Sequence, residues 1–320
     1  MVPRAWSPDG YHGRVEERAL LAVCVLAGCG RFGFDSHVGA GAIDGRTNGA
    51  DGVVAMSDGT TTATGPFGPA TPLVGVNDSG DDVDGGLSSD ELELLWTSSR
   101  SGNAEIWRAR RTAIGAAWSS PALATELDGT SVESDPEISV DGLTVLFTSQ
   151  RPPSGLGDIW IATRTTIASP FGPPVRVPDL STAANECCAV MTTDELNVVF
   201  AGVPSSDAEL FSSSRATQAS PWGSRALIGE LDTTSQESNP YLTPDGLTVY
   251  FDSDRPGGAG GRDLYVATRP AVTAAFSAPT RISELATSSD ERDAWLSPDG
   301  HRLYFSSNRN GNFDLYVAER

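Results

Sequence analysis

The segment that decides the fold reads SPDGHRLYFSSNRNGNFDLY and occupies residues 297–316. Its Asp299-Gly300 pair is typical of a tight hairpin turn. A short strand with aromatic residues follows the turn, and a polar segment then leads to a second strand that begins with Asp314-Leu315-Tyr316. Short aromatic strands separated by turn residues predict antiparallel β structure.

The same pattern occurs five times at intervals of roughly fifty residues. Each repeat has an Asp in the turn, an aromatic six residues later, and another aromatic 23 residues earlier. A short acidic-aliphatic-aromatic motif follows, with an Arg six residues after its acid. The turn residues are Asp90, Asp141, Asp194, Asp245 and Asp299, the earlier aromatics are Phe67, Trp118, Phe171, Trp222 and Phe276, and the Arg residues are Arg111, Arg164, Arg215, Arg269 and Arg320.

A repeat of this length with four short strands is typical of a propeller blade. We therefore predict an all-β propeller of five four-stranded blades over residues 66–320. The first repeat opens at Phe67 with an outermost strand, and the last repeat stops after its third strand at Arg320. We expect the N-terminal strand to complete the last blade and so close the ring.

The motifs Ser297-Pro298-Asp299-Gly300, Ser307-Asn308-Arg309 and Asp314-Leu315-Tyr316 resemble the WD-like propeller repeats of the TolB type. The resemblance extends over residues 67–320 and implies a β-propeller in the bacterial cell envelope. Propellers of that family have six blades, which leaves six as the alternative to the five counted here. The third repeat departs most, because Glu195 follows its turn Asp where three of the other repeats have Gly, and Pro204 replaces an Arg.

The N-terminus has the layout of a secretory signal, with Arg14 and Arg18 before an apolar run that ends in Leu-Ala-Gly-Cys at Cys29. This end resembles the lipobox of bacterial lipoproteins, which implies cleavage after residue 28 and a lipid on Cys29. Residues 29–65 are rich in Gly, Asp and Thr, so we expect a flexible tether. The predicted location is extracytoplasmic, on the outer membrane, facing the periplasm or the cell surface.

The charge of the chain narrows its function. It has 42 acidic residues against 22 basic ones, all of them Arg, for a net charge of −20. A chain this acidic is a poor partner for nucleic acid, and the absence of Lys removes lysine-based chemistry. Only three His residues are present, of which His301 alone lies in the repeats, so His-based metal sites and Ser-His-Asp triads lack material.

A second acidic column lies eight residues before each turn Asp, where the fold would bring it to one mouth of the central channel. An Arg column lies at the hairpin on the same face. We predict a rim that binds a polar ligand, and the alternative is a set of structural ion pairs between neighbouring blades. The rim residues are Asp82, Glu133, Glu186, Glu237, Glu291, Arg100, Arg151, Arg255 and Arg309.

The third repeat has no Arg in this second column, so Glu186 is expected to be an unpaired acid. Cys187 and Cys188 follow it directly. A strained disulfide between these adjacent residues and a pair of thiols are both open.

An acidic loop precedes the first inner strand and has two interpretations, a solvated turn and a weaker alternative of calcium binding. We expect no other cofactor. Its acidic residues are Asp78, Asp81, Asp82 and Asp84.

The sequence offers no unique catalytic cluster. We therefore expect a monomeric, non-catalytic binding propeller for an envelope protein, a peptide or a glycan. The alternative is a glycosidase or sialidase-like hydrolase that uses two carboxylates at the channel mouth.

Overall fold

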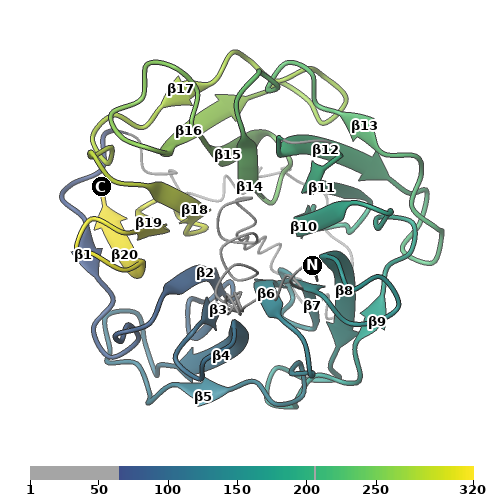
Figure 1. Ribbon diagram of the computed structural model, residues 1–320, viewed down its shortest axis with the longest axis horizontal. Helices are drawn as coiled ribbons and strands as arrows, with labels where there is room; N and C mark the ends of the chain where they lie inside the picture. Colours follow the sequence, from purple (N-terminus) through teal and green to yellow (C-terminus); the bar gives the residue numbers. More distant parts are fainter. Residues whose placement is uncertain (1–64, 205–206) are drawn as a thin grey trace, which may run out of the picture.

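The computed structural model describes residues 65–204 and 207–320, and within them every regular element is a β-strand. Twenty strands form five antiparallel sheets of four strands, arranged as blades around one axis (Figure 1). The predicted five-bladed β-propeller is confirmed, and five rather than six is the number of blades. The predicted signal segment, Cys29 and nearly all of the tether lie outside the described residues.

The blades are numbered along the chain, and each is given from its innermost strand outward. Blade one contains β2 (Asp82–Leu87), β3 (Glu93–Ser98), β4 (Glu105–Arg110) and β5 (Ala122–Leu123). Blade two contains β6 (Glu133–Ile138), β7 (Thr144–Ser149), β8 (Asp158–Thr163) and β9 (Val175–Arg176). Blade three contains β10 (Asn185–Met191), β11 (Asn197–Val203), β12 (Glu209–Ser214) and β13 (Ala226–Leu227). Blade four contains β14 (Glu237–Leu242), β15 (Thr248–Ser253), β16 (Asp263–Thr268) and β17 (Thr280–Arg281). Blade five contains β18 (Glu291–Leu296), β19 (Arg302–Ser307), β20 (Asp314–Glu319) and β1 (Thr71–Pro72).

The ring closes as the sequence predicts. Strand β1 pairs antiparallel with β20, with Thr71 opposite Val317, so the N-terminal end of the described chain supplies the outer strand of blade five (Figure 1). The Leu73 N–H also donates to the Leu315 carbonyl at 2.8 Å. Closure removes the sheet edge that an incomplete fifth blade would otherwise expose.

The repeated Asp organises the turn between the first and second strands of each blade. In blade five, the Ser297 hydroxyl donates to Asp299 Oδ1 at 2.6 Å, and the His301 N–H donates to the same oxygen at 3.0 Å. Gly300 follows in the left-handed region with φ of 72°. Glu91 and Glu195 take this conformation in blades one and three, with φ of 57° and 55°, although the left-handed region is unfavourable for residues other than Gly.

The Arg and aromatic columns meet in space. Each Arg directly after a third strand places its guanidinium 4.3 to 4.4 Å from the ring centre of the aromatic near the outer strand. The aromatic six residues after each turn Asp is buried between blades, as Trp96 and Phe305 show. These two columns therefore build the wedge from which each blade is made.

No helix that could cross a membrane is found between residues 65 and 320, positions 205 and 206 being left aside.

Candidate functional site

The predicted rim acids begin the inner strands, and all five are fully buried. In four blades the acid bonds to the Arg of its own blade, which lies after the second strand. Their shortest Arg–carboxylate distances are 2.6 Å for Asp82–Arg100, 3.1 Å for Glu133–Arg151, 3.1 Å for Glu237–Arg255 and 3.2 Å for Glu291–Arg309.

Each of these Arg residues also donates to a backbone carbonyl and lies against aromatic rings. Arg309 donates to the carbonyl of Leu285, in the connection from blade four to blade five, at 3.0 Å. Its guanidinium lies 5.1 Å and 5.0 Å from the ring centres of Phe305 and Tyr316. The side chain thus joins the start of an inner strand to the segment that enters the blade. These contacts favour the structural interpretation, with each ion pair inside one blade and not between two blades.

In blade three the buried rim acid also forms an ion pair, but with an Arg from a different position in the blade. Glu186 accepts from Arg225 Nη1 at 2.8 Å and from the hydroxyl of Thr182 at 2.5 Å. The prediction that Glu186 is unpaired is therefore wrong. Arg225 stands outside the repeated columns, just before β13, so the repeat pattern gave no signal for it. Its guanidinium also lies 4.5 Å from the Phe211 ring centre, and each rim Arg in the other blades likewise lies against an aromatic ring of its own blade.

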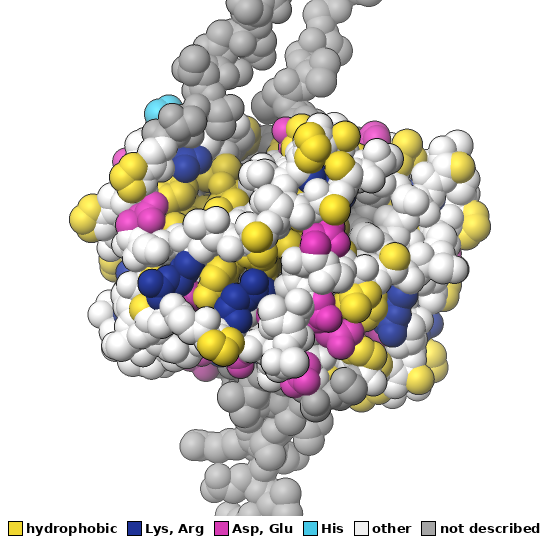
Figure 2. All heavy atoms as spheres, turned by 90° about the horizontal axis from the view of Figure 1, so that it is seen from above, with side chains coloured by type: hydrophobic (Ala, Val, Ile, Leu, Met, Phe, Trp, Pro, Cys, Tyr) yellow, Lys and Arg dark blue, Asp and Glu magenta, His cyan; other side chains and the backbone are white. Residues whose placement is uncertain are grey.

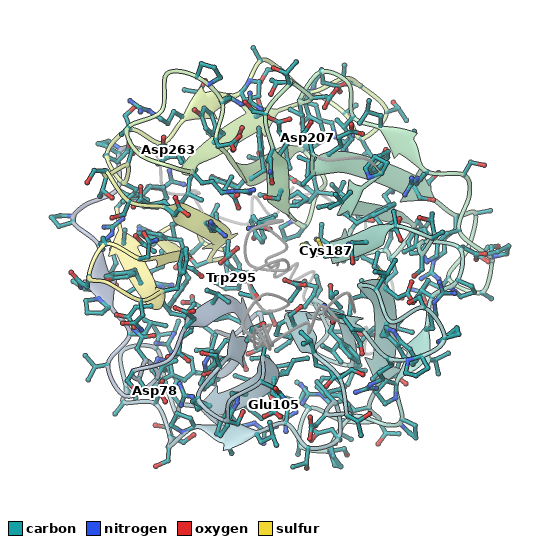
Figure 3. The ribbon with its side chains drawn as sticks, viewed as in Figure 1. Asp78, Glu105, Cys187, Asp207, Asp263 and Trp295 are labelled. Atoms are coloured by element: carbon teal, nitrogen blue, oxygen red, sulfur yellow. The ribbon has the colours of Figure 1, made fainter. Side chains whose placement is uncertain are left out.

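The acidic loop before β2 does not gather its four carboxylates around one point. Asp82 Oδ1 accepts from the indole of Trp96 at 2.8 Å and from Arg100 at 2.6 Å. Asp81 Oδ1 accepts from the Phe313 N–H at 3.0 Å, and Asp78 lies towards the outside of the ring (Figure 3). No group of three or more His, Cys, Asp or Glu side chains that could hold a metal occurs in residues 65–204 and 207–320. Asp82 and Asp84 are buried in β2, so the solvated-turn interpretation is wrong for them and fits only the exposed Asp78 and the half-buried Asp81.

Cys187 and Cys188 lie buried in β10, and Cys187 lies close to the axis (Figure 3). No disulfide joins one to the other. The Cys188 thiol lies 3.7 Å from Asn239 Oδ1 on the next blade.

A set of residues that the sequence analysis missed occupies the innermost strands, two positions after each rim acid. We call this set the axial ring, and it consists of Asp84, Asp135, Cys188, Asn239 and Asp293. All five lie in the left-handed region, with φ between 52° and 61°. In every inner strand the pairing register shifts around this residue. Five strained residues at one position are a reason to look for a role, since such conformations cost about 1–3 kcal/mol each.

Ring residues of successive blades touch one another. Asn239 Nδ2 donates to Asp293 Oδ1 at 2.7 Å, and the Asp84 N–H lies 3.4 Å from Asp293 Oδ2. The carboxyl of Asp84 interacts directly with that of Asp135. All are nearly fully buried. The column could have been found in the sequence, because it lies six residues before each turn Asp and contains three Asp, one Asn and one Cys.

Burial is the main cause of the raised pKa values of the three Asp carboxyls in the ring. It raises the pKa of Asp293 to about 7, and the negative charge of Asp252 adds to the effect. Burial, followed by the charges of Asp135 and Asp293, raises the pKa of Asp84 well above its usual value. The pKa of Asp135 is raised by burial as well. Near neutral pH the ring therefore holds protons that exposed carboxyls would have lost.

No family model matches the sequence, and no curated protein sequence matches it. Solved structures do resemble the fold. The chain is 11% identical to an endo-arabinase from Bacteroides thetaiotaomicron, covering 79% of this chain and 98% of that one, with a TM-score of 0.58. It is 12% identical to the catalytic domain of an α-L-arabinofuranosidase from Coprinopsis cinerea, covering 78% and 95%, with a TM-score of 0.54.

TolB from Acinetobacter baumannii is also among the similar structures, at 15% identity and a TM-score of 0.47. The match covers 77% of this chain but only 56% of that longer protein. At identities this low, structural likeness shows a shared fold and does not show a shared activity.

Proposed function

We propose that this chain is a non-catalytic binding propeller of the bacterial cell envelope, held there by a lipid on Cys29, and that its partner is a cationic protein or peptide. The envelope location rests on the signal and lipobox pattern of the sequence. The nature of the partner rests on the charge that the folded domain presents to solvent.

The exposed charge of the described residues has almost one sign. Arg110 is the one exposed Arg among them, because the other Arg side chains lie partly or fully buried against acids, carbonyls and aromatic rings. Figure 2 shows one side of the propeller, on which acidic and basic side chains lie close together. The exposed acids are Asp78, Asp90, Asp141, Asp179, Asp194, Glu230, Asp245, Asp254, Glu284 and Glu319. Such a surface attracts cationic partners and repels anionic ones.

The test compares the full-length chain with the triple variant Asp141→Asn, Asp194→Asn, Asp245→Asn. Asn keeps the Oδ1 acceptor of each turn but removes its charge. Binding of a basic peptide and of an acidic peptide is measured at low and high salt. We expect basic-peptide binding that weakens with salt and is several-fold weaker in the triple variant.

Arg110→Gln is the matched control, since it removes the exposed positive charge and should not weaken basic-peptide binding. Equal binding of the acidic peptide, or binding of the basic peptide that does not respond to salt, would contradict the proposal. Capture of neutral cell-wall glycan by the wild type with no response to charge would favour a glycan as the partner.

A second candidate function is glycoside hydrolysis. The observation that favours it is the gathering of Asp84, Asp135 and Asp293 near the axis, with the pKa of Asp293 at about 7, a value suited to a general acid. The endo-arabinase and the α-L-arabinofuranosidase described above share this fold. The near-complete burial of the ring weighs against it, because a sugar must reach the carboxyls.

This candidate is tested with chromogenic glycosides, arabinosides included, on the wild type and on Asp293→Asn. Hydrolysis by the wild type that the variant loses, while still folding, would support an enzyme. Absence of turnover on every glycoside in both proteins would leave binding as the function.

A further inference from the structure

The three Asp residues of the axial ring meet where blade one adjoins its two neighbours. Asp84 belongs to β2 of blade one, Asp293 to β18 of blade five, and Asp135 to β6 of blade two. The Asp84 N–H faces Asp293 Oδ2, and its carboxyl faces Asp135. Asp135 Oδ1 is buried and accepts no hydrogen bond. Two carboxyl groups in contact need a proton between them, because each ionised oxygen can only accept.

Within residues 65–204 and 207–320, the charged neighbours do not supply enough positive charge to replace such protons. Arg262, just before β16, is bonded to Asp252 of β15 at 2.7 Å. Arg292 of β18 forms an ion pair with Asp290. Other acidic, thiol and phenol side chains on the inner strands include Glu137 of β6, Cys187 of β10 and Tyr241 of β14, and none of them carries a positive charge.

Hydroxyl groups of the described residues also face the Asp residues of the ring. Thr97 Oγ1 of β3 accepts from the Asp135 N–H at 3.1 Å, and the hydroxyl of Ser306 of β19 lies close enough to the Asp293 carboxyl to lower its pKa. Thr148 of β7 contributes a hydroxyl at Asp135 and at the Cys188 N–H. Arg262 and Arg292 each form an ion pair with another acid, so the buried carboxyls of the ring outnumber the positive charges beside them.

We propose that the buried carboxyls of Asp84, Asp135 and Asp293 hold blades five, one and two together while they are protonated and loosen the junctions between these blades as they ionise. The protons take the place that a bound cation would otherwise fill. This makes the closure of the propeller responsive to the acidity of its compartment.

The direction in which stability changes with pH follows from which state, folded or unfolded, binds more protons. In the unfolded chain an Asp carboxyl titrates near pH 4, whereas the raised pKa values keep the ring protonated in the fold to higher pH. The folded state therefore binds more protons between about pH 4 and pH 7. The stability that these protons contribute is fully present below the pKa of the unfolded chain and is lost as the pH rises through the pKa of the folded state. For each retained proton, the unfolding equilibrium constant rises by up to about tenfold per pH unit.

The experiment is urea unfolding of the full-length chain at pH 5, 6, 7 and 8 for the wild type, Asp293→Asn and Asp245→Asn. The Asn at 293 imitates a permanently neutral carboxyl. We expect the unfolding equilibrium constant of the wild type to rise by at least tenfold from pH 5 to pH 8. Asp293→Asn should show a markedly smaller rise, while Asp245→Asn, in an exposed turn, should follow the wild type.

Equal pH dependence in the wild type and Asp293→Asn would overturn the proposal, as would wild-type stability that stays flat or increases towards pH 8. If Asp293→Asn does not fold, Asp84→Asn is measured in its place. Infrared absorption of the folded wild type at neutral pH gives a reading without any variant. A protonated-carboxyl band that disappears at alkaline pH is expected, and its absence at neutral pH would refute the ring.

Discussion

The guanidinium of Arg320 lies 4.3 Å from the ring centre of Phe67, so the last residue of the chain packs on the start of the propeller. The pair repeats a contact that is found inside the other four blades, for example between Arg269 and Phe276. The Arg320 Nε–H also donates to the Gly300 carbonyl at 2.7 Å, as Arg269 does to Gly246. The closing blade therefore uses the same wedge as the others, although its parts come from opposite ends of the repeat region.

Replacing Phe67 with Ala should destabilise the fold by about 3 kcal/mol or more, because the ring is buried and its loss leaves a cavity. Phe276→Ala removes an equally buried ring at the same position in another blade. We expect similar losses in thermal stability for both. Hydrogen exchange should separate them, since only Phe67→Ala loosens β1 and exposes the amide of Leu73, which is bonded to β20. The same exchange pattern in both variants would contradict a special role for Phe67 in closure.

Arg225 should be required by Glu186 and by little else. Arg225→Met leaves a fully buried carboxylate without its cation, which costs about 3 kcal/mol in the free energy of unfolding. The double variant Arg225→Met, Glu186→Gln should recover much of that loss, because the charge is then gone. Urea unfolding of the wild type, both single variants and the double variant measures the coupling. Additive losses would show that the pair is not coupled.

Glu91 and Glu195 occupy equivalent turn positions with nearly the same φ, yet Gly should have opposite effects at the two sites. Glu195→Gly should raise stability by about 1 kcal/mol or less, since it relieves the left-handed conformation and loses only a 3.3 Å contact with Arg215.

Glu91→Gly should instead lower stability by about 3 kcal/mol. The buried Glu91 carboxylate accepts from both Arg302 Nε at 2.8 Å and Arg302 Nη2 at 2.7 Å, and from the Tyr304 hydroxyl at 2.8 Å. Thermal unfolding of the two variants gives the comparison. A gain in stability from Glu91→Gly would show that relief of backbone strain outweighs the lost contacts of the carboxylate. A large loss from Glu195→Gly would show that the contact with Arg215 outweighs the relief of strain.

The repeat columns made most of the fold predictable. The five turn Asp residues, the buried aromatics and the terminal Arg residues recur at fixed spacing because each blade is the same local wedge, built from residues near one another in the chain. The closing strand was also predictable, since the phase of the repeats left one strand at the start and a gap at the end. The turns with Glu91 and Glu195 kept the fold without Gly, which shows that the Asp carries the turn signal.

The candidate site was harder to predict because its contacts join different repeats or fall outside the columns. The partner of Glu186 is a residue of the same blade with no counterpart elsewhere, and only packing brings Arg225 to it. The axial ring is visible in the sequence as a column, but its importance comes from its convergence on the axis. Spacing along a chain does not say which equivalent positions will face one another across a ring.

The sequence by itself determined five wedges, their strand order and their closure, because hairpin turns and alternating strands are set by neighbouring residues. Only the tertiary structure decided that the rim acids are buried against Arg side chains and that Asp84, Asp135 and Asp293 are buried beside one another. The physical reason is that burial and the summed field of distant charges depend on how the blades assemble. No single repeat contains that information.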